Sequence, residues 1–337
     1  MARVCQHTSA EDVLCFTYSA LMEHEESSNI VLAQALQSCA TPYIGGDHVD
    51  HRDWNALFER PYRAAEQFWL TVWTKSGGET LPTLVIFLSC VGESPIFLWA
   101  PSTYRTEKWL NGAMKNLVAH FVHWVKPERV FSVFGKQCLT LAFERAWTES
   151  TGRTRVPEPY YDAVSSRCTL HSFIDASDHL PNHTTRVADV NDVEKVAALC
   201  KEFAEASVHF PITENKAQIE ARRLISQGRM WVYQIANELV AICAVARESQ
   251  GVAAITKVYT APKWRKQGCA GRLVRSVTKR MLSDEGKKCV VLYVGIDNDA
   301  QHVYNRVGFQ GLCGKPRTEV LDKVLEVGFA ETKKGHW

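Results

Sequence analysis

The feature that most constrains the fold is a short basic turn, Arg265 to Gly271, between a strand-like run and a helix-like run. The run before it, Val252 to Tyr259, is rich in β-branched and small residues and leads into Pro262, as strands often do. The stretch after it, residues 270–285, spaces its apolar residues as a helix does and closes at Gly286. We therefore predict a strand, a tight turn and a helix in succession.

The composition of this turn points to an anion. Gly268 and the small Ala270 let the backbone approach a ligand closely, and the start of a helix directs N–H groups and the positive end of its dipole at one place. Arg265, Lys266 and Arg272 add positive charge around that place. A pyrophosphate fits such a turn, although a basic turn before a helix is also often only a surface loop.

The surrounding pattern alternates strands and helices in one order through the second half of the chain. The expected elements are a strand (185–188), two helices (193–204 and 214–227), three strands (230–235, 239–246 and 252–259), a helix (270–285), a strand (289–294), a helix (300–306) and a possible last strand (319–327). Asp189 is a suitable N-cap and Asn237 marks a hairpin turn. This order predicts the α/β class, with a mixed central sheet flanked by helices.

The chain is long enough for two domains. Its 337 residues exceed the usual size of one domain. The polar stretch 171–185 contains turn-forming residues and no apolar period, so we expect a division into residues 1–175 and 176–337. In the first part, a helical stretch around Leu32 is followed by a strand at 130–134, which leads through Gly135 into a helix at 138–147.

Charge and cysteine usage exclude several classes of function. Lysine and arginine number 39 against 37 aspartate and glutamate, too even a balance for a nucleic-acid-binding surface. The 11 cysteines include no C-x-x-C pair, and several lie in apolar segments, so we expect buried reduced thiols. The first ten residues lack the basic stretch and apolar run that would predict a signal peptide, and no run of about 18 apolar residues occurs. We expect a soluble, cytoplasmic protein without membrane or nucleic-acid partners.

One loop collects residue types that bind divalent ions. Residues 45–53 contain two histidines and three aspartates. Such residues in a turn-forming loop are usually solvated, and we expect no metal site there.

Three segments of the second half together resemble the GNAT superfamily of N-acetyltransferases. Arg265, Gly268 and Ala270 match its acetyl-CoA signature, Q/R-x-x-G-x-G/A. The strand Lys257 to Thr260 looks like the family's pantetheine-binding strand, and the segment from Leu292 through Tyr304 to Gly308-Phe309 is similar to its second motif, which ends in Y-x-x-x-G-F. The likeness covers about residues 185–312. The whole chain resembles tandem GNAT proteins in which a diverged N-terminal GNAT-like domain precedes the cofactor-binding one.

The resemblance implies acetyl-CoA as cosubstrate and a set of residues that bind it. They are Val258, Tyr259, Thr260, Arg265, Lys266, Gln267, Gly268, Cys269, Ala270, Gly271, Asn298 and Tyr304. Asp297 departs from the family, which usually has asparagine there. The corresponding place in the first half, Arg105 to Trp109, has no glycine, so the N-terminal domain should not bind CoA.

The resemblance also implies catalytic roles. The backbone N–H of Val258 corresponds to the group that stabilises the oxyanion, and Tyr304 stands at the general-acid position, where a packing role is the alternative. A phenol with a pKa of about 10 can protonate a thiolate whose thiol has a pKa near 8.5. The strand segment Ala253 to Thr256 has no carboxylate to act as base. The candidate bases are Glu202, Glu205 and His209, or a water held by Tyr293.

The acceptor is the least constrained part of the prediction. Some of the aromatic residues that are dense in the first half, together with Phe203, Phe210 and Trp231, suggest a small, partly apolar acceptor, and we expect a small-molecule amine. Two alternatives stay open: transfer to a protein or peptide, and a CoA-binding sensor or interaction protein without turnover. The acceptor's identity, the length of the acyl group and the oligomeric state are not encoded in any motif.

Overall fold

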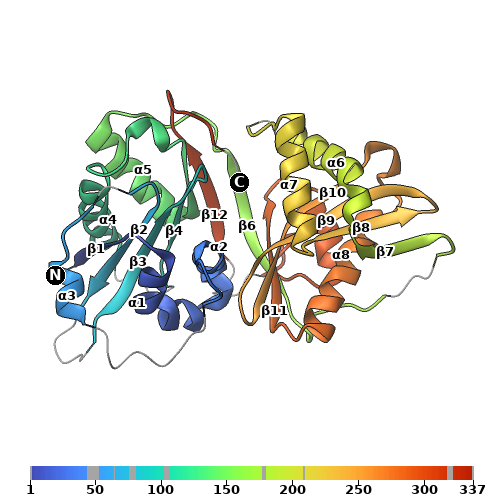
Figure 1. The fold of residues 1–337 in the computed structure, drawn as a ribbon, viewed down its shortest axis with the longest axis horizontal. Coiled ribbons are helices and arrows are strands. Elements are labelled where there is room, and N and C mark those ends of the chain that lie inside the picture. The colour runs from blue at the N-terminus through green and yellow to red at the C-terminus, as the bar shows by residue number, and fades with distance from the viewer. Residues whose placement is uncertain are drawn as a thin grey trace. The chain divides into compact units, whose positions relative to one another are not determined.

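The computed structural model describes residues 2–43, 53–63, 65–75, 81–101, 106–176, 180–207, 209–316 and 322–335. The chain forms two compact units, the first made of Met1–Ala163 with Asp322–Trp337 and the second of Val164–Leu321. Each unit has a sheet with helices packed against it (Figure 1). The predicted α/β class with a mixed sheet is confirmed, because parallel and antiparallel strand pairs occur together.

The second unit contains the basic turn. Its elements are β7 (His183–Val187), α6 (Val193–Ala206), α7 (Glu214–Ser226), β8 (Met230–Ile235), β9 (Glu238–Glu248), β10 (Val252–Thr260), α8 (Cys269–Lys279), β11 (Cys289–Gly295) and α9 (Ala300–Val307). The strand β6 (Tyr161–Cys168) begins in the first unit and ends in the second. The sheet order is β6-β11-β10-β9-β8-β7, and β10 is parallel to β11 but antiparallel to β9.

Two separate apolar clusters cover the two faces of this sheet. Leu273 and Val277 of α8 pack with Val258, Val290 and Tyr304 on one face. Residues of α6 and α7 pack with Tyr259 and other strand residues on the opposite face. Val258 and Tyr259, which follow each other in β10, therefore face opposite sides of the sheet. Ala253 and Ile255 lie on the same face as Val258, so the alternation is interrupted after Ile255, where the pairing with β9 is irregular.

Local signals explain most of these elements. Asp189 caps the 3-10 turn Val190–Asp192 that precedes α6, with its side chain accepting from the backbone N–H of Asn191. The helix α8 continues as a π-helical turn, Arg280–Asp284, before Gly286 adopts a positive φ. The expected helix 270–285 corresponds to α8 and the π-helical turn after it. The expected turn at Asn237 is also present, since β8 and β9 form a tight hairpin around it.

The first unit repeats this order of elements. It comprises β1 (Arg3–His7), α1 (Ala10–Glu23), α2 (Glu25–Ser38), α3 (Trp54–Glu59), β2 (Phe68–Thr74), β3 (Thr83–Cys90), β4 (Ile96–Trp99), α4 (Glu107–Phe121), the 3-10 turn η2 (Pro127–Arg129), β5 (Ser132–Lys136), α5 (Gln137–Thr151) and β12 (Lys323–Gly328). Its sheet order is β1-β2-β3-β4-β5-β12, and β4 is parallel to β5. Apart from the short α3, helices and strands follow one another as in the second unit.

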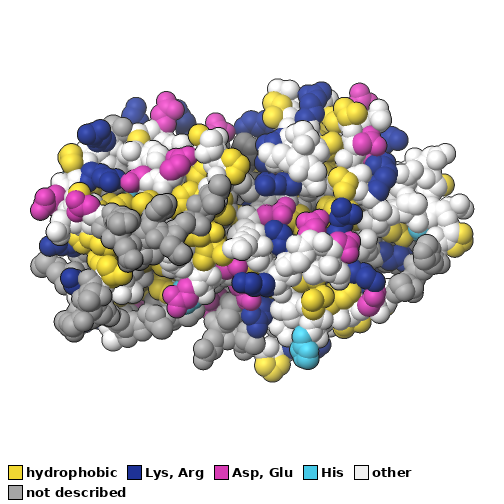
Figure 2. All heavy atoms as spheres, turned by 60° about the horizontal axis from the view of Figure 1, so that its bottom comes forward, with side chains coloured by type: hydrophobic (Ala, Val, Ile, Leu, Met, Phe, Trp, Pro, Cys, Tyr) yellow, Lys and Arg dark blue, Asp and Glu magenta, His cyan; other side chains and the backbone are white. Residues whose placement is uncertain are grey.

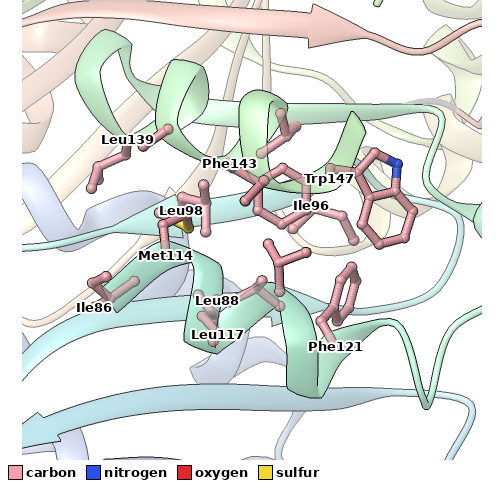
Figure 3. Packing of buried hydrophobic residues seen from close by; sticks show 14 of the residues in the cluster. Ile86, Leu88, Ile96, Leu98, Met114, Leu117, Phe121, Leu139, Phe143 and Trp147 are labelled. Carbon is pink, nitrogen blue, oxygen red and sulfur yellow. The ribbon is translucent and has the colours of Figure 1, made fainter. Parts of the chain in front are cut away.

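Aromatic side chains dominate the core of the first unit. Phe121 of α4 contacts Phe143 and Trp147 of α5, with ring centroids 6.0 and 5.5 Å away (Figure 3). Phe143 and Trp147 are stacked at 5.7 Å. Each such buried side chain contributes about 1.5–3 kcal/mol through removal of apolar surface from water. These tryptophan and phenylalanine residues are thus structural.

The C-terminal tail belongs to the first unit. β12 pairs antiparallel with β5, placing Leu325 opposite Gly135 and Val327 opposite Val133. Leu325, Val327 and Phe329 join the core of that unit. The expected division assigned all of residues 176–337 to the second domain, whereas the compact units assign 164–175 to the second and 322–337 to the first. The apolar pattern of a strand does not specify which sheet edge it joins.

The strand expected at 130–134 lies two residues further along the chain. Val130 follows the turn Pro127–Arg129, and β5 extends to Lys136, so that Gly135 is within the strand instead of after it. The reason is the pairing with β12, which extends to Lys136.

The surface carries mixed charge. Acidic and basic side chains are interspersed over the face drawn in Figure 2. Within the described residues no helix is both long and apolar enough to cross a membrane. Cys90, Cys200, Cys243 and Cys289 are buried, as the sequence predicted.

Candidate functional site

β10 and β11 separate partway along their length. Their parallel pairing covers four residue pairs and ends at Ile255 and Leu292, although β10 continues to Thr260 and β11 to Gly295. Two irregularities in the pairing of β10 with β9 lie at the same level, on either side of Ile255. Such bulges bend a strand and increase its twist. Among the strands that the structure describes, the second half of β10 therefore pairs with β9 alone.

The separation exposes the middle of a strand that is otherwise buried. Residues 252–255 of β10 are buried, whereas Thr256, Lys257 and Val258 are half-buried. Backbone N–H and C=O groups on this edge of β10 are not used by β11 and are available to an extended ligand.

The basic turn ends in a helix terminus that no side chain caps. Gly268 is the N-cap of α8, with φ of 80°, and no side chain in the described part of the chain caps this helix. Lys266 also has a positive φ, of 61°. The first N–H groups of a helix need partners from outside it, so this terminus is suited to an anion.

Side chains from other elements hold the turn in place. Glu238 of β9 accepts from Nε1 of Trp264 at 3.0 Å and pairs with Lys263 at 2.5 Å. Arg272 donates to the Gln267 carbonyl oxygen at 2.7 Å. A Cβ atom on Gly268 would lie 2.9 Å from Nη1 of Arg272, so this guanidinium would have to shift, and the φ of 80° itself favours glycine.

Arg265 is directed at the strand and not at the helix terminus. Its Nε donates to the Thr260 carbonyl oxygen at 3.1 Å, and its Nη2 donates to the Tyr259 hydroxyl at 3.0 Å. The guanidinium also lies over the Tyr259 ring, 5.2 Å from its centroid. Lys266 and Arg272 are the remaining cations of the predicted cradle.

Val258 and Tyr304 lie on the same face of the sheet. Tyr304 is 8% exposed, and its ring centroid is 5.9 Å from that of Phe309. Both Val258 and Tyr304 belong to the cluster that includes α8. Asn298 has a structural contact, because its Oδ1 accepts from the backbone N–H of Ala300, the first residue of α9, at 2.9 Å.

The three candidate bases have different surroundings. Glu202 lies beside the Tyr259 hydroxyl, and its Oε2 is buried without a hydrogen-bond partner among the described residues. Glu205 is exposed and lies 3.9 Å from Lys201. The ring of His209 makes an edge contact with Phe210, 6.4 Å between centroids. Of the three, Glu202 is the one with a neighbour on β10 among these contacts, the Tyr259 hydroxyl.

A further carboxylate, Glu220 of α7, was not foreseen. It pairs with Lys257 of β10 at 3.1 Å, and the two side chains are only 20% and 13% exposed. Lys257 also lies over the ring of Phe203, 5.5 Å from its centroid. No sequence signal links Glu220 to β10, because the contact joins residues far apart in the chain.

The aromatic residues expected around the acceptor do not form one group. Phe203 packs on the face of α6 and α7, whereas Trp231 belongs to the cluster on the face of α8 and has Arg280 over its ring. The sheet separates them because residues that face α6 and residues that face α8 lie on opposite sides of it.

The Cys269 side chain is buried in the cluster on the face of α8, so only its backbone N–H group belongs to the turn. Burial raises the pKa of the Cys269 thiol, as expected for a small packing residue. The loop at 45–53 lies outside the described residues except for Asp53, which caps α3.

Comparison with known proteins decides the family. The acetyltransferase (GNAT) family model matches residues 196–309. These residues form a GNAT acetyltransferase domain. The protein is accordingly an acyltransferase. No curated protein sequence matches the chain.

Solved structures share the fold over almost the whole chain. A GCN5-related N-acetyltransferase from Sphaerobacter thermophilus has a TM-score of 0.54 at 14% identity, covering 97% of this chain and 94% of its own. A GNAT-family acetyltransferase from Colwellia psychrerythraea has a TM-score of 0.52 at 11% identity, covering 97% and 99%. At such identities the likeness shows the fold alone. It extends through both units, which agrees with the tandem GNAT-like architecture predicted from sequence.

The structure also explains the glycine of the second GNAT motif. Gly308 ends α9 with φ of 111°, and a Cβ atom there would lie 2.0 Å from the Ser172 carbonyl oxygen. The segment after β6 thus packs directly on this glycine, and a larger residue would displace it.

Proposed function

We propose that the protein transfers the acetyl group of acetyl-CoA directly to the amine of a small molecule, with the chemistry in the second unit. The observation that carries the proposal is the combination of an unpaired strand edge in β10 with the uncapped, glycine-containing terminus of α8. A CoA molecule needs both, because its pantetheine arm is extended and carries amides, whereas its pyrophosphate is a compact dianion.

The residues around the turn would hold the cosubstrate as follows. Backbone groups of Val258, Tyr259 and Thr260 bind the pantetheine arm. The N–H groups from Gln267 to Gly271, including those of Cys269 and Ala270, face the pyrophosphate, with Lys266 and Arg272 nearby. Arg265 and Asn298 keep the turn and the start of α9 in place.

The reaction begins when a neutral amine attacks the thioester carbonyl carbon. The C=O electron pair moves to oxygen, where the backbone N–H of Val258 stabilises the negative charge. Collapse of this intermediate breaks the C–S bond, and Tyr304 donates its proton to the departing thiolate. The amide keeps the acetyl group, and the nitrogen loses its extra proton to a base.

The base is assigned to the α6 side of the site. An alkylamine has a pKa of about 10 and is protonated at neutral pH, so one proton must leave before attack. Glu202 is the candidate closest to β10, and Glu205 and His209 follow it in the chain. A water held by Tyr293 is the remaining route.

One rival function is favoured by a specific observation. β10 has no carboxylate between Ala253 and Thr256, and its half-buried Lys257 is already paired with Glu220. A chain without an active base would bind CoA as a sensor and not turn it over.

Thiol release separates the two functions. The purified protein is supplied with acetyl-CoA and a panel of small amines, and free CoA thiol is measured against a Tyr304→Phe control. Amine-dependent release that falls at least tenfold in the control supports the transferase. Acetyl-CoA binding without release for any amine supports the sensor, and release only with peptides would move the acceptor to that class. Absence of binding overturns the proposal.

A further inference from the structure

The second half of β10 needs contacts to replace the strand neighbour that it has lost. Beyond Ile255 it pairs with β9 only, and yet its backbone must keep a fixed geometry to bind an extended ligand. Two side chains on the face of α6 and α7 connect it to those helices. Lys257 pairs with Glu220 of α7 at 3.1 Å, and Tyr259 packs edge-on against Phe203 of α6 at 6.3 Å.

Tyr259 also connects β10 to the basic turn. It is 9% exposed, and its hydroxyl accepts from Nη2 of Arg265 at 3.0 Å. Because Arg265 donates at the same time to the Thr260 carbonyl oxygen, its guanidinium joins the start of the turn to the end of the strand. Arg265 is three residues before the N-cap glycine of α8, so its position bears on the helix terminus.

The Glu202 carboxylate lies near the same hydroxyl. Burial in the first place, and the nearby Glu202 in the second, raise the pKa of Tyr259 above its ordinary value. The phenol therefore keeps its proton at neutral pH.

We propose that Tyr259 is a positioning residue, whose hydroxyl fixes Arg265 and thereby the anion-binding turn. It acts from the face of the sheet opposite Val258, so it does not touch the reacting atoms. This inference rests on the proposed function, in that the turn is taken to bind CoA.

The test compares two tyrosine-to-phenylalanine variants in the same unit. Tyr259→Phe removes one hydroxyl and keeps the ring against Phe203. Tyr233→Phe is the matched control, since Tyr233 is 3% exposed and its hydroxyl bonds Nδ1 of His183 at 2.8 Å, on β8 and away from the turn. Each variant removes one hydroxyl from a buried tyrosine, so their thermal stabilities should fall by similar amounts.

CoA affinity is the first readout. We expect the Kd of CoA, measured by calorimetry, to rise about tenfold in Tyr259→Phe and to stay unchanged in Tyr233→Phe, because a hydrogen bond to a charged group is lost in one and not in the other. In a double-mutant cycle, Arg265→Lys should weaken binding much less in the Tyr259→Phe background than in the wild type. Equal affinities of the two phenylalanine variants, or additive effects in the cycle, would overturn the inference.

Trypsin cleavage provides a readout that needs no CoA. The turn contains Lys263, Arg265 and Lys266, and cleavage requires local opening. We expect Tyr259→Phe to be cut in this turn several-fold faster than wild type and Tyr233→Phe to be cut at the wild-type rate. If the wild type fails to bind CoA, the proposed function fails, while faster cleavage would still show that Tyr259 fixes the turn. Unchanged cleavage would contradict the positioning role.

Discussion

The two units have the same order of strands and helices but differ at the helix that follows their fourth strand. In the second unit, α8 starts at Gly268 with a positive φ and no side-chain cap. In the first, α4 starts at Thr106, whose hydroxyl oxygen accepts from the backbone N–H of Trp109 at 3.2 Å. One terminus is open to an anion, and the other is already satisfied by its own chain.

The parallel strand pairs of the two units, β10–β11 and β4–β5, also differ in whether they separate. β10 and β11 separate after Ile255 and Leu292, whereas β4 and β5 stay close beyond their last pair. A Cβ atom on Gly135 of β5 would lie 2.6 Å from the Leu98 carbonyl oxygen of β4. All of β4 is buried, in contrast to the half-buried Val258 of β10.

This comparison teaches that the fold alone does not make the site. Both units supply a strand, a turn and a helix in the right order, but a CoA molecule needs an open strand edge and an uncapped helix together. The expectation that the first unit does not bind CoA stays a prediction, and the capped α4 and the closed strand pair support it.

The largest effect on acetyl-CoA affinity is expected from adding a methyl group at Gly268, the N-cap of α8. Gly268→Ala forces an alanine into a left-handed conformation, at about 1–2 kcal/mol, and brings its Cβ to 2.9 Å from Arg272. The Kd of acetyl-CoA should rise about 5- to 30-fold in calorimetry. Gly286→Ala is the control, because Gly286 has φ of 66° and no atom within 4 Å of its would-be Cβ. An equal loss of affinity in the two variants would contradict the assignment of the turn as the binding site of the pyrophosphate.

The next largest effect is expected where β4 and β5 lie close together in the first unit. Gly135→Ala should destabilise that unit by about 1–3 kcal/mol, as overpacking does, because its Cβ meets backbone. Hydrogen exchange in peptides from β4 and β5 measures the change. Gly112→Ala is the opposite control, since Gly112 is exposed within α4 with open space around it, and should gain about 0.5–1 kcal/mol. Unchanged exchange in Gly135→Ala would mean that the strands are not held together there.

The first unit should also be more sensitive to acid. His7 is fully buried, between Asp12 at 2.8 Å and Thr71 at 3.0 Å, and burial lowers its pKa below the ordinary 6.5. The unfolded chain then binds more protons, so this stabilising contribution is complete above pH 6.5. It is lost as pH falls towards the folded pKa, by at most about 1.4 kcal/mol per pH unit. Hydrogen exchange of β1 and β2 at pH 7 and pH 5.5 measures it, and a slope unchanged in His7→Gln would refute it.

The smallest effect comes from removing the cap of α4. Thr106→Ala should lower the stability of the first unit by about 1 kcal/mol, and Thr106→Gly by only a few tenths. Neither should create a second CoA site, because β4 and β5 remain closed. A second binding event in the calorimetry of Thr106→Gly would show that the cap alone excludes CoA from this unit.

The sequence predicted the elements of the second unit well because their signals are local. Apolar spacing along α6 and the glycine at 268 depend on near neighbours in the chain, and so does the two-residue hairpin turn at Asn237. The placement of β12 could not be predicted, since Leu325 and Val327 would suit the edge of either sheet.

Within the site, the residue types were easier to predict than the direction in which each side chain points. The motif located Arg265, but its contact with Tyr259 depends on which face of β10 that tyrosine occupies. The irregular pairing around Ile255 changes which residues of β10 share a face, and the sequence does not show it. Glu238 comes from the neighbouring strand β9 and Glu220 from helix α7. No spacing in the sequence predicts either contact, because the partners are far apart in the chain.

The number of CoA molecules bound per chain tests the account most directly. Titration of the intact protein with acetyl-CoA in a calorimeter should give one site per chain, which Gly268→Ala weakens and Thr106→Gly leaves unchanged. Two sites per chain, or one site that survives Gly268→Ala at full affinity, would contradict the claim that only the second unit holds the cosubstrate.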